Sequence, residues 1–160
     1  MKRLPPARTS DASRGDKLTV EFTRHVRDRC LCLHVQRAAR ALARRFDDAL
    51  GVVGLTSGQF SLLISLNRAE APTIGDVSSL LAMDRTSLTA NLKPLERRRL
   101  VKVAVDADDK RSRRLTLTAA GHDLLAEAAP LWKRAHAETE GLVIGSLGDL
   151  RAALRALHQQ

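Results

Sequence analysis

The sequence predicts a mainly α-helical fold with one small β-hairpin. Apolar residues recur at intervals of three and four along most of the 160-residue chain, which is the spacing of one face of a helix. The composition is rich in Ala, Leu and Arg and only 2% aromatic, which favours helix over strand. Residues 100–117 differ, because their Leu and Val residues form two short runs around a charged turn, the pattern of a hairpin.

The charge balance restricts the class of partner. Lysine and arginine exceed aspartate and glutamate by nine, and such a surplus attracts polyanions, so nucleic acid is the expected partner. No apolar run approaches the ~20 residues that a membrane span requires. The beginning of the chain also lacks the apolar segment of a secretion signal. We therefore expect a cytoplasmic protein without a membrane partner.

The first expected elements are a tail and a long helix. Residues 1–17 combine Pro, Gly, Ser and charge without apolar periodicity, and they predict a flexible basic tail. From about residue 18 to residue 50, the apolar spacing predicts one long amphipathic helix. Gly51 and Gly54 are expected to end it, because glycine accepts the left-handed conformation at a helix C-terminus.

Three short helices are expected between residues 56 and 99. Thr56 can cap the first, which runs through Asn67, and Thr73 with Asp76 forms a capping box for the second. Asp84 can cap the third, which runs to about residue 99. The residues expected to face the core from the second and third helices are Ile74, Val77, Leu80, Leu81, Leu88, Leu92 and Leu95.

The hairpin and two helices complete the chain. The runs at 100–105 and 115–117 flank the charged turn DADDKRSR. Thr118 can cap a helix to about residue 140, which we expect Pro130 to kink, because proline removes a backbone donor. The last helix, at about 147–157, carries leucines on one face.

Helix, turn, helix and basic hairpin together predict a winged helix-turn-helix, whose second helix fits the major groove of DNA. Residues 84–114 hold ten basic and five acidic side chains. Their surplus of five positive charges is more than half of the net charge of +9. The outward face of the third helix offers short polar side chains, among them an asparagine suited to adenine. The candidate DNA-binding residues are Arg85, Thr86, Ser87, Thr89, Ala90, Asn91, Lys93 and Arg97 on the helix and Lys110, Arg111 and Arg113 in the hairpin.

Residues 83–121, MDRTSLTANLKPLERRRLVKVAVDADDKRSRRLTLTAAG, resemble the recognition helix and wing of MarR-type transcriptional regulators. The segments GLTSGQFSLL and TIGDVSSLLAMD resemble the preceding helices, and the resemblance covers about residues 30–158. It implies a sequence-specific regulator, a repressor released by a small-molecule effector. It also implies a homodimer on a pseudo-palindromic operator, with residues 18–50 and 119–160 forming the dimer and residues 55–117 binding DNA.

The same resemblance assigns roles in the wing. Arg111 would enter the minor groove, where narrow tracts concentrate negative potential, and Asp109 would hold it in place. Two positions depart from the family pattern. Arg99 stands where the family usually has glycine, so we expect the helix to close without a left-handed residue. Pro94 lies inside the recognition helix and is expected to bend it.

Cys30 and Cys32 leave a redox function open. Cys32 occupies the position of the reactive cysteine in MarR-related peroxide sensors of the OhrR type, although this chain lacks the tyrosines that those sensors use. Cys32 is expected on the apolar face, where burial raises a thiol pKa, whereas Cys30 lies on a basic face and is the better redox candidate. A metal site is not expected, because on a helix Cys32 points away from Cys30 and His34.

Other functions remain as alternatives. Effectors in this family are often small anionic or phenolic compounds, and His34, Arg37 and Arg40 are the candidate effector-binding residues. A non-specific architectural protein that coats DNA by charge is a further possibility. No nucleophile beside a base, paired carboxylates or phosphate-binding glycine loop occurs, so we expect neither an enzyme nor a cofactor.

Overall fold

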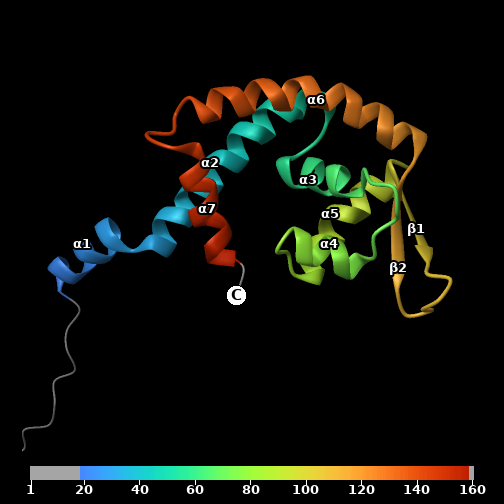
Figure 1. Cartoon of the computed structure of the whole chain (residues 1–160), viewed down its shortest axis with the longest axis horizontal. Helices are drawn as coiled ribbons and strands as arrows, with labels where there is room; N and C mark the ends of the chain where they lie inside the picture. The colour runs from blue at the N-terminus through green and yellow to red at the C-terminus, as the bar shows by residue number, and fades with distance from the viewer. Residues whose placement is uncertain (1–18, 159–160) are drawn as a thin grey trace, which may run out of the picture. The chain divides into compact units, whose positions relative to one another are not determined.

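A computed structural model of the chain describes residues 19–158. The predicted basic tail, residues 1–17, lies outside the described residues. The chain divides into two compact units, Met1–Ala38 and Ala39–Gln160, which are described separately below. The elements of both are drawn in Figure 1.

The first unit contains helix α1 (Val20–Arg29) and the beginning of α2 (Leu31–Leu50). The prediction of one uninterrupted helix is wrong, because Cys30 has an extended backbone with φ −71° and ψ 107°. Its amide still donates to the carbonyl of Val26 at 2.9 Å, and its carbonyl accepts from the amide of His34 at 3.1 Å. Cys30 therefore ends one helix and begins the next.

The second unit begins with the rest of α2, which continues into the 3₁₀ turn η1 (Gly51–Val53). Gly54 follows with φ +68°, so the predicted left-handed glycine closes this segment as expected. Helices α3 (Ser57–Leu66), α4 (Ile74–Leu80) and α5 (Arg85–Arg97) come next. Strands β1 (Val101–Val105) and β2 (Arg113–Leu117) and helices α6 (Ala119–Glu140) and α7 (Leu147–His158) complete the unit.

The predicted caps are confirmed. The hydroxyl of Thr56 accepts from the amide of Gln59 at 3.2 Å, and that of Thr73 accepts from Asp76 at 3.1 Å. In both cases the side chain of the third residue returns a bond, which completes a capping box. Asp84 and Thr118 cap α5 and α6, because their side-chain oxygens accept from the amides of the residues three positions later.

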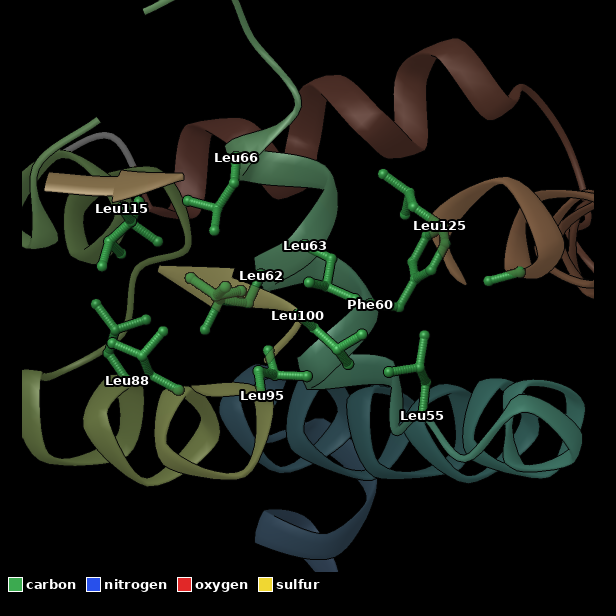
Figure 2. Close-up of a cluster of buried hydrophobic side chains, with 14 of the residues drawn as sticks. Leu55, Phe60, Leu62, Leu63, Leu66, Leu88, Leu95, Leu100, Leu115 and Leu125 are labelled. Carbon is green, nitrogen blue, oxygen red and sulfur yellow. The ribbon is translucent and has the colours of Figure 1, made fainter. Parts of the chain in front are cut away.

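The core lies between α3, α5, α6 and the hairpin, and it is built mainly of leucine (Figure 2). The fully enclosed side chains include Leu50, Leu62, Leu63, Leu88, Leu95 and Leu115. The predicted burial of Leu80 is wrong, because this side chain is 62% exposed. Helix α4 ends at Leu80, and the chain then turns through Ala82 at φ +48°. Leu81, as predicted, packs against the core, and Met83 does so as well.

The hairpin is antiparallel, with Val101 opposite Leu117 and Val105 opposite Arg113. Its second strand is also attached to the segment between α3 and α4. Arg114 forms a bridge with Thr73, and the amide of Leu115 donates to the carbonyl of Pro72 at 2.9 Å. The wing is therefore anchored at its root on the helical part of the unit.

Helix α5 ends in an unusual way for its sequence. Arg99 takes φ +57°, the left-handed conformation, so the expectation that this helix closes without one is wrong. The amide of Leu100 donates to the carbonyl of Leu95 at 2.9 Å and that of Arg99 donates to Glu96 at 2.8 Å, which is a Schellman motif. These two bonds, and the burial of Leu100, offset a backbone cost of about 1 kcal/mol for a non-glycine residue.

The two C-terminal helices differ in burial. Helix α6 stays a single helix through Pro130 and is curved in Figure 1. In α7, by contrast, Leu150, Leu154 and Leu157 are each more than 40% exposed, so its apolar face is uncovered in the single chain.

Among the described residues, no single helix is long and apolar enough to span a membrane. The bent pair Leu31–Val53 and Ser57–Leu66 passes that test of length and composition only when taken together.

Candidate nucleic-acid interface

The outward face of α5 is a stripe of exposed side chains opposite the buried leucines. Thr86, Ala90, Lys93 and Arg97 are spaced four, three and four residues apart, and all four are exposed. Small side chains at the start of the stripe allow close approach to base edges, while the two basic residues farther along suit phosphates. The structure therefore brings these four predicted residues together on one surface, which we name the α5 stripe.

Two further predicted residues, Ser87 and Thr89, are exposed but already use their hydroxyl protons. Ser87 Oγ donates to the carboxylate of Asp84 at 2.7 Å, and Thr89 Oγ1 donates to the carbonyl of Arg85 at 2.7 Å. The bonds from Ser87 hold the pKa of Asp84 below its ordinary value. Both hydroxyls can still accept a hydrogen bond, so they suit donor groups on DNA bases better than acceptors.

Asn91 lies differently from the prediction that it faces the groove. The side chain is half-buried, and its Nδ2 donates to the carbonyl of Ser87 at 3.0 Å. Its Oδ1 faces the N-terminus of α3, where a Cβ added to Gly58 would lie 3.2 Å away. Asn91 is thus at the edge of the α5 stripe, and its base contact remains a prediction.

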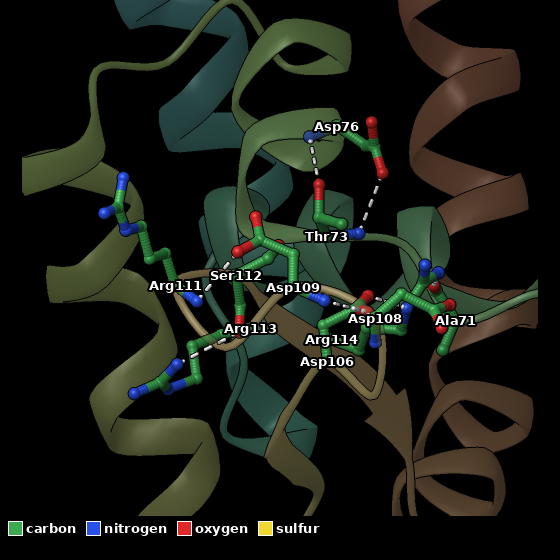
Figure 3. Close-up of polar contacts among 10 residues, drawn as sticks. All are labelled: Ala71, Thr73, Asp76, Asp106, Asp108, Asp109, Arg111, Ser112, Arg113 and Arg114. Carbon is green, nitrogen blue, oxygen red and sulfur yellow. Dashed lines mark hydrogen bonds and ion pairs between the residues drawn. The ribbon is translucent and has the colours of Figure 1, made fainter.

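The wing carries the remaining predicted residues, Lys110, Arg111 and Arg113, all of them exposed. Arg111 and Arg113 are drawn in Figure 3. Asp109 Oδ1 accepts from the amide of Arg111 at 2.9 Å, so the expected partner of Arg111 holds its backbone. The guanidinium of Arg113 bends back, and its Nη1 donates to the carbonyls of Lys110 and Ser112, each at 3.0 Å.

Asp106 is a wing residue whose role the sequence pattern did not predict. It is only 5% exposed, and its Oδ1 accepts from the amides of Asp108 at 2.8 Å and Asp109 at 3.2 Å. Its Oδ2 pairs with Nε of Arg114, whose Nη1 donates to the carbonyl of Ala71 at 2.8 Å. The two amides and then Arg114 hold the pKa of Asp106 below its ordinary value. The available signal was a carboxylate directly after a predicted strand.

The cysteines lie in the first unit as free thiols. Cys30 is half-buried at the helix break, whereas Cys32 is exposed, with Gln36 Nε2 at 3.3 Å from its sulfur. The expected burial of Cys32 is therefore not seen in the single chain. Nor do the described residues contain a group of three His, Cys, Asp or Glu side chains arranged to hold a metal ion.

A cavity of about 310 Å³ opens between α2, α3 and α6 in the second unit. Trp132 lines it together with Phe46 and Phe60. The indole ring is stacked against Phe60 at a centroid distance of 6.0 Å and against His136 at 4.5 Å. The other lining residues are Ala39, Leu42, Ala43, Leu50, Ser57 and Ser61. Of the predicted effector-binding residues, Arg40 does not line this cavity, and His34 and Arg37 are exposed on the first unit.

Known proteins share this architecture. Residues 53–112 match the MarR family. The transcriptional activatory protein BadR of Rhodopseudomonas palustris is 30% identical over 132 residues, covering 79% of this chain and 74% of BadR. The M. tuberculosis regulator MosR, solved in complex with DNA, is 37% identical, with a TM-score of 0.74 over 81% of this chain and 94% of MosR. The repressor CouR of Rhodococcus jostii, bound to a 23-mer DNA duplex, is 28% identical, with a TM-score of 0.67 over 82% and 92% of the two chains.

The fold, with its exposed α5 stripe and basic two-stranded wing, defines a winged helix-turn-helix regulator that binds DNA. The chain belongs to the MarR family of transcription regulators. Members of this family are dimers and are transcription factors, not enzymes. The predicted fold class is thus confirmed, and so is the family to which residues 83–121 show a resemblance.

Proposed function

We propose that this protein represses transcription in the cytoplasm by occupying a specific operator, and that a small molecule releases it. The observation that carries sequence specificity is the α5 stripe, because small, exposed side chains at its start permit direct contact with base edges. CouR is a repressor and BadR an activatory protein. Repression is the simpler mechanism, since a protein that covers a promoter needs no further contact with polymerase.

The operator is proposed to be a pseudo-palindrome read by a homodimer. Residues 18–50 and 119–160 would supply the dimer contacts, and residues 55–117 the DNA contacts. The uncovered leucine face of α7 supports this division, because an exposed apolar stripe is stabilised when a partner covers it. Two recognition helices related by a two-fold axis would read half-sites about one helical turn apart, ~10 base pairs.

The first test is a gel-shift titration with DNA from upstream of the gene for this protein, competed with random duplex. The titration is made at ~150 mM salt, where unspecific attraction is strongly screened. A preference of ~10³ or more for the upstream DNA supports a sequence-specific regulator. The opposite outcome is that random duplex competes equally well, both against the upstream DNA and against duplexes selected from a random library. That result supports the alternative of an architectural protein that coats DNA.

The effector is proposed to bind in the cavity around Trp132. Aromatic and aliphatic side chains dominate its wall, with two serine hydroxyls and no charged group, so an uncharged aromatic molecule fits best. The alternative set, His34, Arg37 and Arg40, would instead suit an anion. Phenol and benzoate are therefore a discriminating pair of probes in a thermal-melting and DNA-release assay. Trp132→Leu should abolish a response to phenol, whereas Arg40→Ala should leave it unchanged.

Redox sensing remains a second candidate function, favoured by one observation. Cys32 is exposed and lies next to the break at Cys30, where the helix is already interrupted. Hydrogen peroxide oxidises an accessible thiolate to a sulfenic acid and is itself reduced to water. The test compares peroxide-dependent loss of DNA binding in the wild type, Cys30→Ser and Cys32→Ser. Equal loss in the wild type and both variants would rule out a role for these thiols.

A further inference from the structure

We propose that Asp106 is a positioning residue for DNA binding, which holds the wing tip so that Arg111 reaches the duplex. This inference rests on the proposed DNA contact of Arg111. It assigns to an acidic side chain a favourable effect on the binding of a polyanion.

Asp106 shapes the turn at the wing tip. The buried carboxylate of Asp106 accepts both successive amides of Asp108 and Asp109, while its own amide donates to the carbonyl of Ser112 at 3.2 Å. Asp109 then holds the amide of Arg111. Two hydrogen bonds in series, through Asp109, thus connect Asp106 to the backbone of Arg111 (Figure 3). Without the carboxylate of Asp106, the amides that begin this chain lose their charged acceptor.

The same carboxylate contacts the root of the wing. Asp106 also pairs with Arg114, which donates to Ala71 in the segment that precedes the capping box of α4. Two backbone contacts lie beside this hydrogen bond. They are the β-bridge between Arg114 and Thr73 and the hydrogen bond from the amide of Leu115 to the carbonyl of Pro72. Through Arg114, the carboxylate therefore connects the wing-tip turn to the segment between α3 and α4, which leads into the helices α4 and α5. The position of the tip relative to the α5 stripe depends on it.

The sign of the effect on DNA affinity distinguishes positioning by Asp106 from simple electrostatics. Neutralising an acidic residue near DNA normally strengthens binding, because it removes repulsion from the phosphates. Asp108 provides the matched control, since it is exposed, lies two residues from Asp106 and carries the same charge. Electrostatics alone predicts that Asp106→Asn and Asp108→Asn change affinity in the same direction. Positioning by Asp106 predicts opposite directions.

The experiment measures operator affinity of both asparagine variants at several salt concentrations, with an operator first selected by the wild type from a random library. We expect Asp106→Asn to weaken binding about tenfold, as for energetically coupled neighbours, and Asp108→Asn to preserve or strengthen it. In an Arg111→Ala background, Asp106→Asn should cause no further loss. Arg114→Gln tests the same ion pair through its other partner. The part of its affinity loss that comes from positioning should also vanish in the Arg111→Ala background.

Two results would overturn the inference. One is that Asp106→Asn strengthens binding as Asp108→Asn does. The other is that Asp106→Asn and Arg114→Gln cost as much without Arg111 as with it, which would indicate a general loss of fold. If the wild type selects no operator at all, it is the proposed sequence specificity that fails. In that case the same variants are compared on unspecific duplex, where the opposite signs remain the prediction for Asp106.

Discussion

Arg98 Nη1 donates a hydrogen bond of 2.6 Å to the carbonyl oxygen of Gly54, 44 residues earlier in the chain. The same guanidinium reaches the carbonyl of Val53 at 3.5 Å. It thus caps the C-terminal end of the 3₁₀ turn that follows α2, while its own backbone ends α5. The recognition helix is therefore tied at this point to the turn that joins α2 to α3, two helices that line the Trp132 cavity.

Arg98→Ala should lower the free energy of unfolding by about 1 kcal/mol, because it removes a hydrogen bond from a charged donor at a partly solvated site. Urea denaturation measures this change. Arg97→Ala is the control, since Arg97 is exposed on the α5 stripe next to Arg98. Arg97→Ala should weaken DNA binding with little change in stability. Equal destabilisation by both variants would contradict the role assigned to the bond with Gly54.

Arg111→Ala should weaken operator binding and reduce the slope of log affinity against log salt by about one, as expected for the loss of one phosphate-neutralising charge. The slope is measured by titrations at four or more salt concentrations. Asp109→Asn should weaken binding less, because it replaces the charged acceptor of the Arg111 amide with a neutral one and leaves the arginine charge in place. An unchanged salt slope for Arg111→Ala would place Arg111 away from the DNA.

Asn91→Ala tests whether an amide at the edge of the α5 stripe reads a base. If it does, the variant should lose ~1–3 kcal/mol of discrimination at a single operator position and little affinity for random duplex. Competition with singly substituted operators measures this. Equal losses on operator and random DNA would show that Asn91 serves α5 and the neighbouring α3 only, in keeping with its bond to Ser87.

Arg99→Gly should stabilise the fold by about 1 kcal/mol, because glycine adopts the left-handed conformation at this Schellman motif without a steric cost. The melting temperature should rise by several degrees, measured calorimetrically at low protein concentration. Arg99→Ala is the control, since it removes the same charge and keeps the Cβ. If alanine stabilises as much as glycine, the effect comes from charge and not from the backbone.

Stability should fall at acid pH through Asp106. Its pKa is held below the ordinary value by the Asp108 and Asp109 amides and by Arg114, so the folded state favours the charged carboxylate. The unfolded state then binds the proton more readily as the pH falls. The stabilisation is complete above the unfolded pKa of about 4 and is lost below it. Urea denaturation between pH 6 and pH 3 should show a shallower decline for Asp106→Asn than for the wild type.

Local signals allowed much of this fold to be predicted. The caps at Thr56, Thr73, Asp84 and Thr118 depend on side chains three residues or fewer from the amides they satisfy, so the pattern is visible in the sequence. The buried leucines of α5 follow from helical spacing in the same way. Where an element is decided by its own residues, prediction and structure agree.

Features that leave no local signal in the sequence were not predicted. The break at Cys30 changes one backbone angle, needs neither glycine nor proline, and leaves the apolar spacing on both sides unaltered. Leu80 has the spacing of a core residue, but it is exposed, and the turn at Ala82 brings Met83 inward instead, beside the correctly predicted Leu81. Likewise, the role of Asp106 depends on Arg114, and through it on Ala71, 35 residues before Asp106. Such pairs cannot be read from a single sequence.

The cavity contains the one tryptophan of a chain that has no tyrosine. Ultraviolet emission from this protein therefore comes almost wholly from Trp132, a ring stacked between Phe60 and His136. A molecule that enters the cavity would touch the emitting ring directly, and a change in the stack would alter its surroundings. The protein thus carries its own spectroscopic probe at the place where an effector is proposed to bind, and occupancy can be followed without an attached dye.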